Sequence, residues 1–128
     1  SERTTERASA ECFGFDDAGN LSTGYANHSS EIELLEGVSP LIELVAGFGN
    51  SSRTDSKKVS GEGLVFDNLI AARLNGPLLP LNPHLADRFL RIVTKRSGVS
   101  YQQNSEFAKQ ADGFAYKARE ELKQRLAR

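Results

Sequence analysis

The chain has little of several residue types, and each shortage excludes a class of protein or site. Of its 128 residues none is methionine or tryptophan, two are histidine, and Cys12 is the single cysteine. One cysteine cannot form an internal disulfide, so we expect a cytoplasmic protein. The histidines and the cysteine are scattered without metal-ligand spacing, so no metal site is predicted. Because no methionine opens the chain, we expect a fragment, a processed product or a trimmed protein.

The chain also lacks a long apolar run and a strong net charge. No run approaches the roughly 18 apolar residues of a membrane span, and no signal peptide is recognisable. A nucleic-acid surface usually carries a basic excess, so the net charge of −1 predicts no nucleic-acid partner. Neither G-x-x-x-x-G-K-S/T nor G-x-G-x-x-G occurs, and no cofactor is expected.

What the sequence does contain is a series of short strands. Strands are predicted over residues 1–16, 21–28, 32–35 and 41–48, because each run is rich in β-favouring or apolar types between turn signals. The runs 64–66 and 69–74 flank Asp67-Asn68 and predict a hairpin. Residues 49–60 show no periodic pattern, so we expect them to form a mobile loop.

Two helices are predicted after the strands, so the fold class is expected to be α/β. The first spans about residues 83–96, with Asn82 as N-cap, Pro83 at the first helical position and Gly98 after its end. The second spans about residues 105–126. Its apolar stripe is predicted to pack on the sheet or on a partner and consists of Phe107, Ala111, Phe114, Ala118, Leu122 and Leu126.

Residues 72–87 form the most distinctive stretch, with three of the four prolines. Pro77 and Pro80 fix φ and donate no backbone hydrogen bond, and Gly76 permits a sharp turn. We therefore expect a rigid loop that holds Asn75 at the end of the strand over 69–74. In an α/β sheet, ligands bind at the carboxyl ends of the strands, so Asn75 is a candidate site residue.

Three other side chains have catalytic chemistry. His28 follows a strand within a polar cluster that includes Asn27, so it is either a general acid or base or a strand-end residue that satisfies backbone groups. His84 is expected to be solvated in the first turn of a helix. Cys12 lies inside a strand pattern without a glycine-rich elbow, and we do not expect it to be a nucleophile.

Four stretches, taken in order, match the motifs of one known family. They are Thr23-Gly24-Tyr25-Ala26-Asn27-His28-Ser29-Ser30; Ala46-Gly47-Phe48-Gly49-Asn50; Gly61-Glu62-Gly63 followed by Phe66-Asp67-Asn68; and Leu74-Asn75-Gly76-Pro77-Leu78-Leu79-Pro80 with Asn82-Pro83 and Leu85-Ala86-Asp87. Together they resemble the cobyric-acid-synthase-like class I glutamine amidotransferases, most of all the glutaminase subunits of lipid II isoglutaminyl synthases. The resemblance covers nearly the whole chain.

The resemblance implies a domain that releases ammonia from glutamine. Residues 1–98 would be the C-terminal half of its sheet domain, and residues 99–128 a helical extension. In the family a cysteine on a strand-to-helix elbow attacks the side-chain amide, and a histidine takes and returns the proton. The ammonia passes to a Mur-ligase-like, ATP-dependent synthase subunit, which amidates the peptidoglycan precursor lipid II.

The sequence departs from the family pattern at both catalytic positions. The histidine position falls on Asn75, and Cys12 does not match the context of the elbow cysteine, which would lie upstream of the first residue. An amide cannot act as a general base near neutral pH, so the isolated chain is expected not to hydrolyse glutamine. Asn27, His28, Gly76 and Pro77 are predicted to bind substrate or support the site.

Two alternative functions remain open. One is a non-catalytic scaffold or regulatory subunit of the same fold, and the other is an amidotransferase domain of the cobyric acid synthase type.

Overall fold

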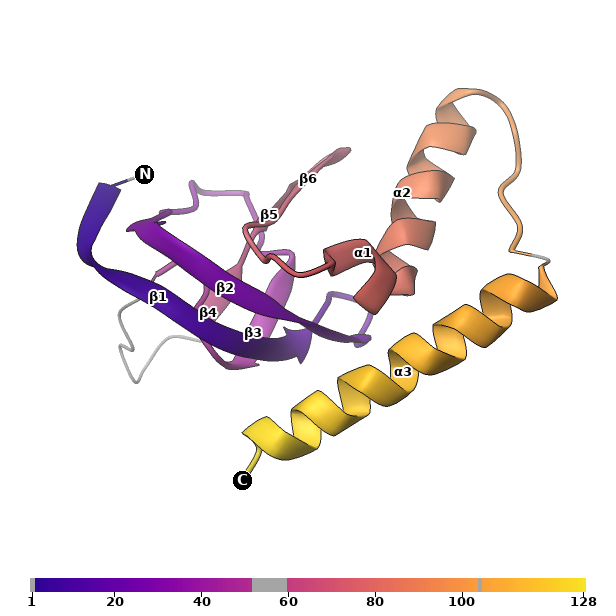
Figure 1. The fold of residues 1–128 in the computed structure, drawn as a ribbon. Helices are drawn as coiled ribbons and strands as arrows, with labels where there is room; N and C mark the ends of the chain where they lie inside the picture. Colours follow the sequence, from indigo (N-terminus) through magenta and orange to yellow (C-terminus); the bar gives the residue numbers. More distant parts are fainter. Residues whose placement is uncertain (1, 52–59, 104) are drawn as a thin grey trace.

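A computed structural model describes residues 2–51, 60–103 and 105–128 of the chain. Strands form one part of the molecule and helices the other, as Figure 1 shows. The elements, in chain order, are β1 (Glu2–Phe15), β2 (Leu21–Glu31), β3 (Ile42–Ala46), β4 (Ser60–Glu62), β5 (Leu64–Phe66), β6 (Leu69–Ala71), α1 (Leu78–Leu81), α2 (Pro83–Arg96) and α3 (Glu106–Leu126). None of the helices in these ranges is long and apolar enough to cross a membrane.

The strands form a curled four-stranded sheet, in the order β2-β1-β3-β4, and a separate β5–β6 hairpin. Every strand pair in the described ranges is antiparallel. The predicted mixture of strands and helices is thus confirmed, as an antiparallel sheet with C-terminal helices. Strands joined by a tight turn pair in the antiparallel direction, so the rule that ligands bind at the carboxyl ends of parallel strands does not apply to this sheet.

The predicted strands agree with the structure in part. β1, β2 and the β5–β6 hairpin are confirmed, and Asp67 has the positive φ of 50° that the hairpin turn needs. The strand predicted over 32–35 is wrong, because a turn at Glu36 and Gly37 follows an irregular segment there. The predicted mobile loop lies mostly outside the described residues. The strand predicted over 69–74 ends early, at Ala71.

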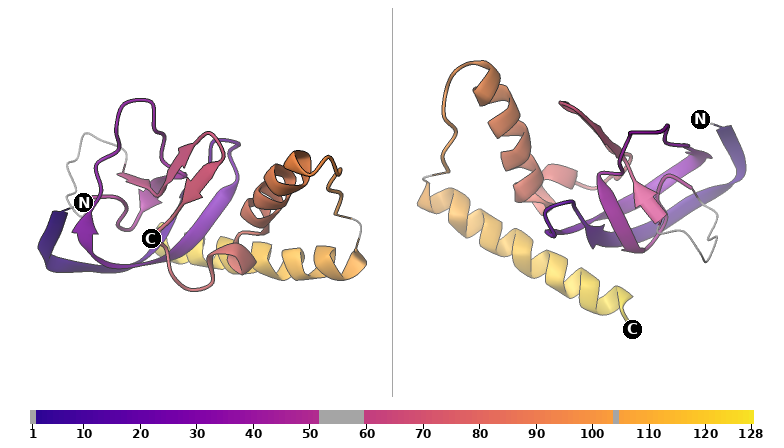
Figure 2. Two further views of the ribbon diagram at one scale, coloured as in Figure 1. Left: turned by 90° about the horizontal axis from the view of Figure 1, so that it is seen from above. Right: turned by 180° about the vertical axis from the view of Figure 1, so that it is seen from behind.

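The helix boundaries are predicted more closely. α2 begins at Pro83 and ends at Arg96, and α3 begins one residue after its N-cap Ser105, whose side chain accepts a hydrogen bond from the Ala108 N–H. The sequence did not predict α1, a single turn that includes Pro80. Figure 2 shows α3 lying along the outside of the sheet, and α2 directed away from the sheet.

The apolar stripe predicted for α3 does not pack on the sheet through its aromatic residues, and its packing on a partner stays a prediction. Phe107 and Phe114 are 80% and 64% exposed, whereas Ala115 and Arg119 are buried. The Arg119 guanidinium donates to the Leu81 carbonyl at the end of α1, and Arg125 pairs with Glu11 on β1. These polar contacts orient the helix so that its aromatic side chains face away from the sheet.

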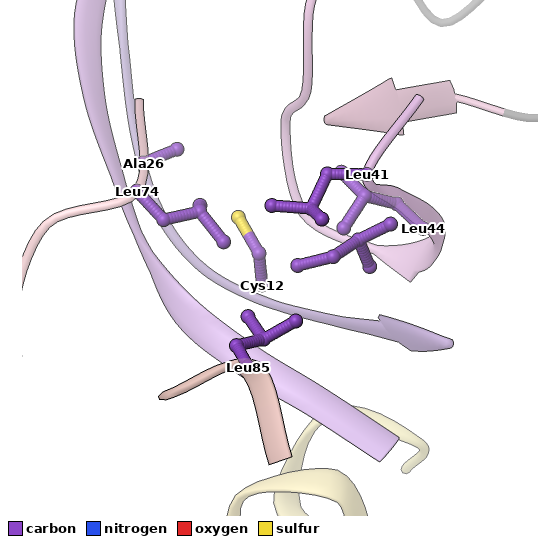
Figure 3. Close-up of a cluster of buried hydrophobic side chains, with 7 residues drawn as sticks. Cys12, Ala26, Leu41, Leu44, Leu74 and Leu85 are labelled. Atoms are coloured by element: carbon purple, nitrogen blue, oxygen red, sulfur yellow. The ribbon is translucent and has the colours of Figure 1, made fainter. Parts of the chain in front are cut away.

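The core lies where β1, β2, β3 and the first turn of α2 meet (Figure 3). Cys12 is at its centre, and the cluster is completed by Ala26, Leu41, Ile42, Leu44, Leu74 and Leu85. Leu74 and Leu85 lie near the two ends of the proline-rich stretch over residues 72–87. Their burial fastens both ends of that stretch to the sheet.

Candidate functional site

Asn75 lies beside β2, at the edge of the sheet. Its backbone N–H donates to the Tyr25 carbonyl at 2.8 Å, and its carbonyl accepts from the Tyr25 N–H at 3.2 Å. The side chain is exposed. The prediction that Asn75 directly follows a strand over 69–74 is wrong, because that strand ends at Ala71 and the backbone of Asn75 is held by β2 instead.

The structure brings Asn27 to the same face as Asn75 but places His28 on the other. Paired residues of an antiparallel bridge point their side chains to one face, and residues along a strand alternate. Asn75 therefore shares its face with Tyr25 and Asn27, both exposed. Asn27 Oδ1 accepts from Arg7 Nε at 2.6 Å, so this face is lined with polar groups.

Asn82 fixes the loop that follows Asn75. Its side chain does not cap α2, as the sequence had suggested, but is completely buried. Its Oδ1 accepts from the Thr23 N–H at 2.9 Å, and its Nδ2 donates to the Thr23 and Leu78 carbonyls at 2.8 Å and 2.7 Å. One amide thus joins β2, α1 and α2, which makes the proline-rich loop rigid.

Gly76 and Pro77 form the exposed corner of this loop. Gly76 has φ of +61°, a conformation that glycine adopts without strain, and Pro77 precedes the first residue of α1. Neither of these two residues carries a reactive side chain. The two residues turn the chain directly after Asn75, and their predicted part in substrate binding or in supporting the site stays a prediction.

His28 belongs to a second polar group, together with Glu62 and Arg73. Glu62 is completely buried; its Oε1 accepts from the Arg73 N–H at 2.6 Å. The Arg73 guanidinium donates to the carbonyls of Ser30 at 2.5 Å and Gly49 at 2.8 Å. In the described part of the chain His28 Nε2, Glu62 Oε2 and Arg73 Nε are buried without a hydrogen-bond partner.

The surroundings of His28 favour its neutral form. Burial lowers the pKa of His28, and the nearby Arg73 guanidinium lowers it further, while Glu62 acts in the opposite direction. A neutral imidazole can accept a proton, but this one lies on the face away from Asn75. The structure therefore does not unite the two predicted residues in a single reactive centre.

His84 forms a third group with Ser22 and Asp16. Its Nε2 lies 2.9 Å from Ser22 Oγ and 3.8 Å from Asp16 Oδ2. The expectation of a solvated His84 is wrong, because only 18% of its side chain is exposed. Burial lowers its pKa, although Asp16 opposes this. Hydrogen bonds from Ala18 and Asn20 hold the Asp16 carboxylate in the β1–β2 turn.

These three residue types are those of a hydrolase triad, but the arrangement differs. In a triad the nucleophile and the carboxylate face opposite nitrogens of the imidazole. Here Ser22 and Asp16 face the same nitrogen, and Ser22 is completely buried. The group therefore ties the β1–β2 turn to the start of α2 and has no access to a substrate.

Cys12 is likewise closed to substrate. It is completely buried, and its Sγ makes weak hydrogen bonds to the carbonyls of Ala10 and Phe48 at 3.5 Å and 3.4 Å. Burial raises the pKa of the thiol, so the thiolate that a nucleophile needs is disfavoured. Gly47, with φ of +96°, passes close to the sulfur.

Sequence reasoning did not identify the roles of Glu62, Arg73 and Asn82. Glu62 stands between two glycines, which was a usable signal, since a carboxylate flanked by glycines often serves a close backbone contact. The partners of Arg73 lie 24 and 43 residues away, so no local pattern could have shown them. Within the described ranges, no three His, Cys, Asp or Glu side chains are grouped so as to hold a metal ion.

No model of a known protein family and no curated protein matches the chain.

Proposed function

We propose that the chain is the C-terminal half of a glutaminase domain of the cobyric-acid-synthase-like amidotransferase kind. In the complete protein this domain supplies ammonia to a Mur-ligase-like, ATP-dependent synthase subunit that amidates lipid II. The chain alone does not hydrolyse glutamine. The observation that carries the proposal is the fixed presentation of Asn75, the position of the family histidine, on an exposed polar face.

The construction of the loop supports this proposal. Two backbone hydrogen bonds to Tyr25 hold Asn75, and the buried amide of Asn82 holds the turn behind it. A catalytic base must be held within hydrogen-bond reach of the proton it takes, so a rigid, exposed position is what a base requires. Thus the motif residues that resemble the family also build the geometry that its chemistry needs.

The polar face around Asn75 suits a carboxamide substrate. Asn27 and Arg7 lie on neighbouring strands, and Tyr25 Oη is 2.7 Å from Ser9 Oγ. Hydroxyl, amide and guanidinium groups can bind the carboxylate and amide ends of glutamine. In the proposal these residues orient glutamine, while the attacking cysteine comes from residues other than these, because Cys12 is inaccessible.

A non-catalytic scaffold of the same fold is the second candidate, and Asn75 itself favours it. An asparagine keeps the shape of the loop without the proton equilibrium of a histidine. In this version the chain keeps the partner-binding surface of the domain and has no role in releasing ammonia.

Glutamine-dependent amidation by the full-length protein with its ligase partner distinguishes the candidates. Under the proposal, the sequence of the full-length protein contains a Gly-x-Cys-x-Gly elbow. When the side-chain amide of glutamine carries a nitrogen isotope, that isotope should appear in the amidated product. Cysteine-to-alanine substitution at that elbow should abolish transfer, while Cys12→Ala should not. A full-length protein without the elbow, or a ligase that uses free ammonia equally well with and without the chain, would contradict the glutaminase proposal.

A further inference from the structure

A hollow of about 430 Å³ lies between the β5–β6 turn and the last turns of α2. Asn68 lines it from the turn, and Arg91, Ile92, Lys95 and Arg96 line it from the helix. It shares no lining residue with the face of Asn75, with the His28 group or with the His84 group. The proposed function therefore gives it no role.

The hollow has a strong positive charge for its size. Three of its five lining residues are cations, and in the described part of the chain none of the three forms an ion pair. The neighbouring Arg88, by contrast, pairs with Asp17 at 2.9 Å. Unpaired cations gathered around a concave surface attract an anionic partner and steer its approach.

The position of the hollow favours separate carboxylates over a phosphate. The free backbone N–H groups that bind phosphate lie at a helix N-terminus, whereas this hollow lies at the C-terminal end of α2. Two guanidiniums and one ammonium on successive turns instead suit several carboxylates, each paired with one cation. An acidic polypeptide presents its charges in this way.

Exposed apolar side chains lie next to the turn that lines the hollow, and a small anion could not use them. Phe66 and Leu69 flank the turn that carries Asn68, and they are 51% and 58% exposed. Ile92 contributes a further apolar side chain inside the hollow. Exposed apolar groups beside charges are typical of surfaces that bind a protein partner.

From these observations we infer that the hollow between the β5–β6 turn and α2 is a docking site for an acidic segment of a partner protein. Its carboxylates pair with Arg91, Lys95 and Arg96, and its apolar side chains contact Phe66 and Leu69. The inference does not depend on the proposed function, because it needs neither glutamine nor ammonia.

Fluorescence anisotropy with the full chain and a short labelled peptide of Glu-Glu-Leu-Ser repeats tests this site. We expect binding at about 1 mM peptide or below in low salt, and none for the Gln-Gln-Leu-Ser counterpart. Combined Arg91→Gln, Lys95→Gln and Arg96→Gln should weaken binding about tenfold. Combined Phe66→Ser and Leu69→Ser should weaken it by a smaller factor without changing its salt dependence.

The matched control removes the same charge from α3 and the C-terminus, as Lys109→Gln, Lys117→Gln and Arg128→Gln. This control should bind the acidic peptide within about twofold of the wild-type chain. Circular dichroism confirms that each variant keeps its helices. Several outcomes would overturn the inference: no binding, an equal loss in the control, displacement by equimolar inorganic phosphate, stronger binding to phosphatidylglycerol vesicles, or self-association that the triple variant abolishes.

Discussion

At the scale of single residues, buried amides and imidazoles set the structure of this chain. Asn82 replaces the usual N-cap interaction with three hydrogen bonds to backbone groups of β2 and α1. The bonds to the Thr23 N–H and carbonyl are buried, so these two backbone groups depend on this one side chain. The residue could be predicted as a helix boundary, but its partner Thr23 lies 59 positions away and could not be.

Replacing Asn82 should be one of the most damaging single changes in the chain. Asn82→Ala leaves the buried N–H and carbonyl of Thr23 without their side-chain partner, whereas the Leu78 carbonyl keeps the backbone N–H of residue 82, so the free energy of unfolding should fall by about 2–4 kcal/mol. Asn68→Ala, at an exposed turn, should change it by less than about 0.5 kcal/mol. Urea titration measures both. Equal midpoints for the two variants would show that the buried amide does not hold the loop.

The two histidines predict how stability depends on pH. Burial lowers the pKa of both His28 and His84 below the ordinary value of 6.5, so the folded state favours the neutral imidazoles. The unfolded chain binds protons more readily as the pH falls, and the stabilisation present above pH 6.5 is lost on acidification. Melting temperature should therefore fall between about pH 7 and pH 5.

The control for this pH dependence is the His28→Gln and His84→Gln double variant. It lacks both imidazoles, so its melting temperature should change less over the same pH range. If the wild-type chain and the double variant lose stability in parallel, the carboxylates account for the acid sensitivity.

At the scale of elements, helix ends and turns could be predicted from local residues, but the orientation of a helix on the sheet could not. The ends of α2 could be predicted from Asn82, Pro83 and Gly98, and the hairpin from Asp67-Asn68. Each of these signals acts on the backbone of neighbouring residues, so it can be read locally. On α3, periodicity found an apolar stripe that does not meet the sheet. Spacing shows which residues share a face, but long-range contacts such as Arg119 to Leu81 decide which face packs.

The orientation of α3 yields a second stability test. Phe114 is 64% exposed, so Phe114→Ala should change the free energy of unfolding by less than about 0.5 kcal/mol. Leu85 is 1% exposed, and Leu85→Ala should cost about 2–5 kcal/mol through lost burial and a cavity. Thermal melting of both variants compares them. A large loss for Phe114→Ala would mean that the aromatic stripe is the packed one.

At the scale of the whole molecule, the chain presents one rigid loop and several separate polar groups. The motif predicted that residues 74–87 matter, and the structure shows why they are rigid. The motif could not show that His28 and Asn75 lie on opposite faces, because their placement depends on the antiparallel pairing of β2. The proposed activity therefore depends on Asn75 and on a cysteine from outside these residues.

The most direct test of the proposed function introduces a base at residue 75. It measures glutamine-dependent ammonia release by the full-length protein with the proposed ligase partner, with and without Asn75→His. A positioned general base contributes about 10²–10⁴-fold, so the histidine variant should be faster by a factor in that range. Gln102→His, at an exposed position in the α2–α3 connection, is the control and should leave the rate unchanged. Equal rates for Asn75 and Asn75→His would contradict the assignment of residue 75 as the position of the lost base.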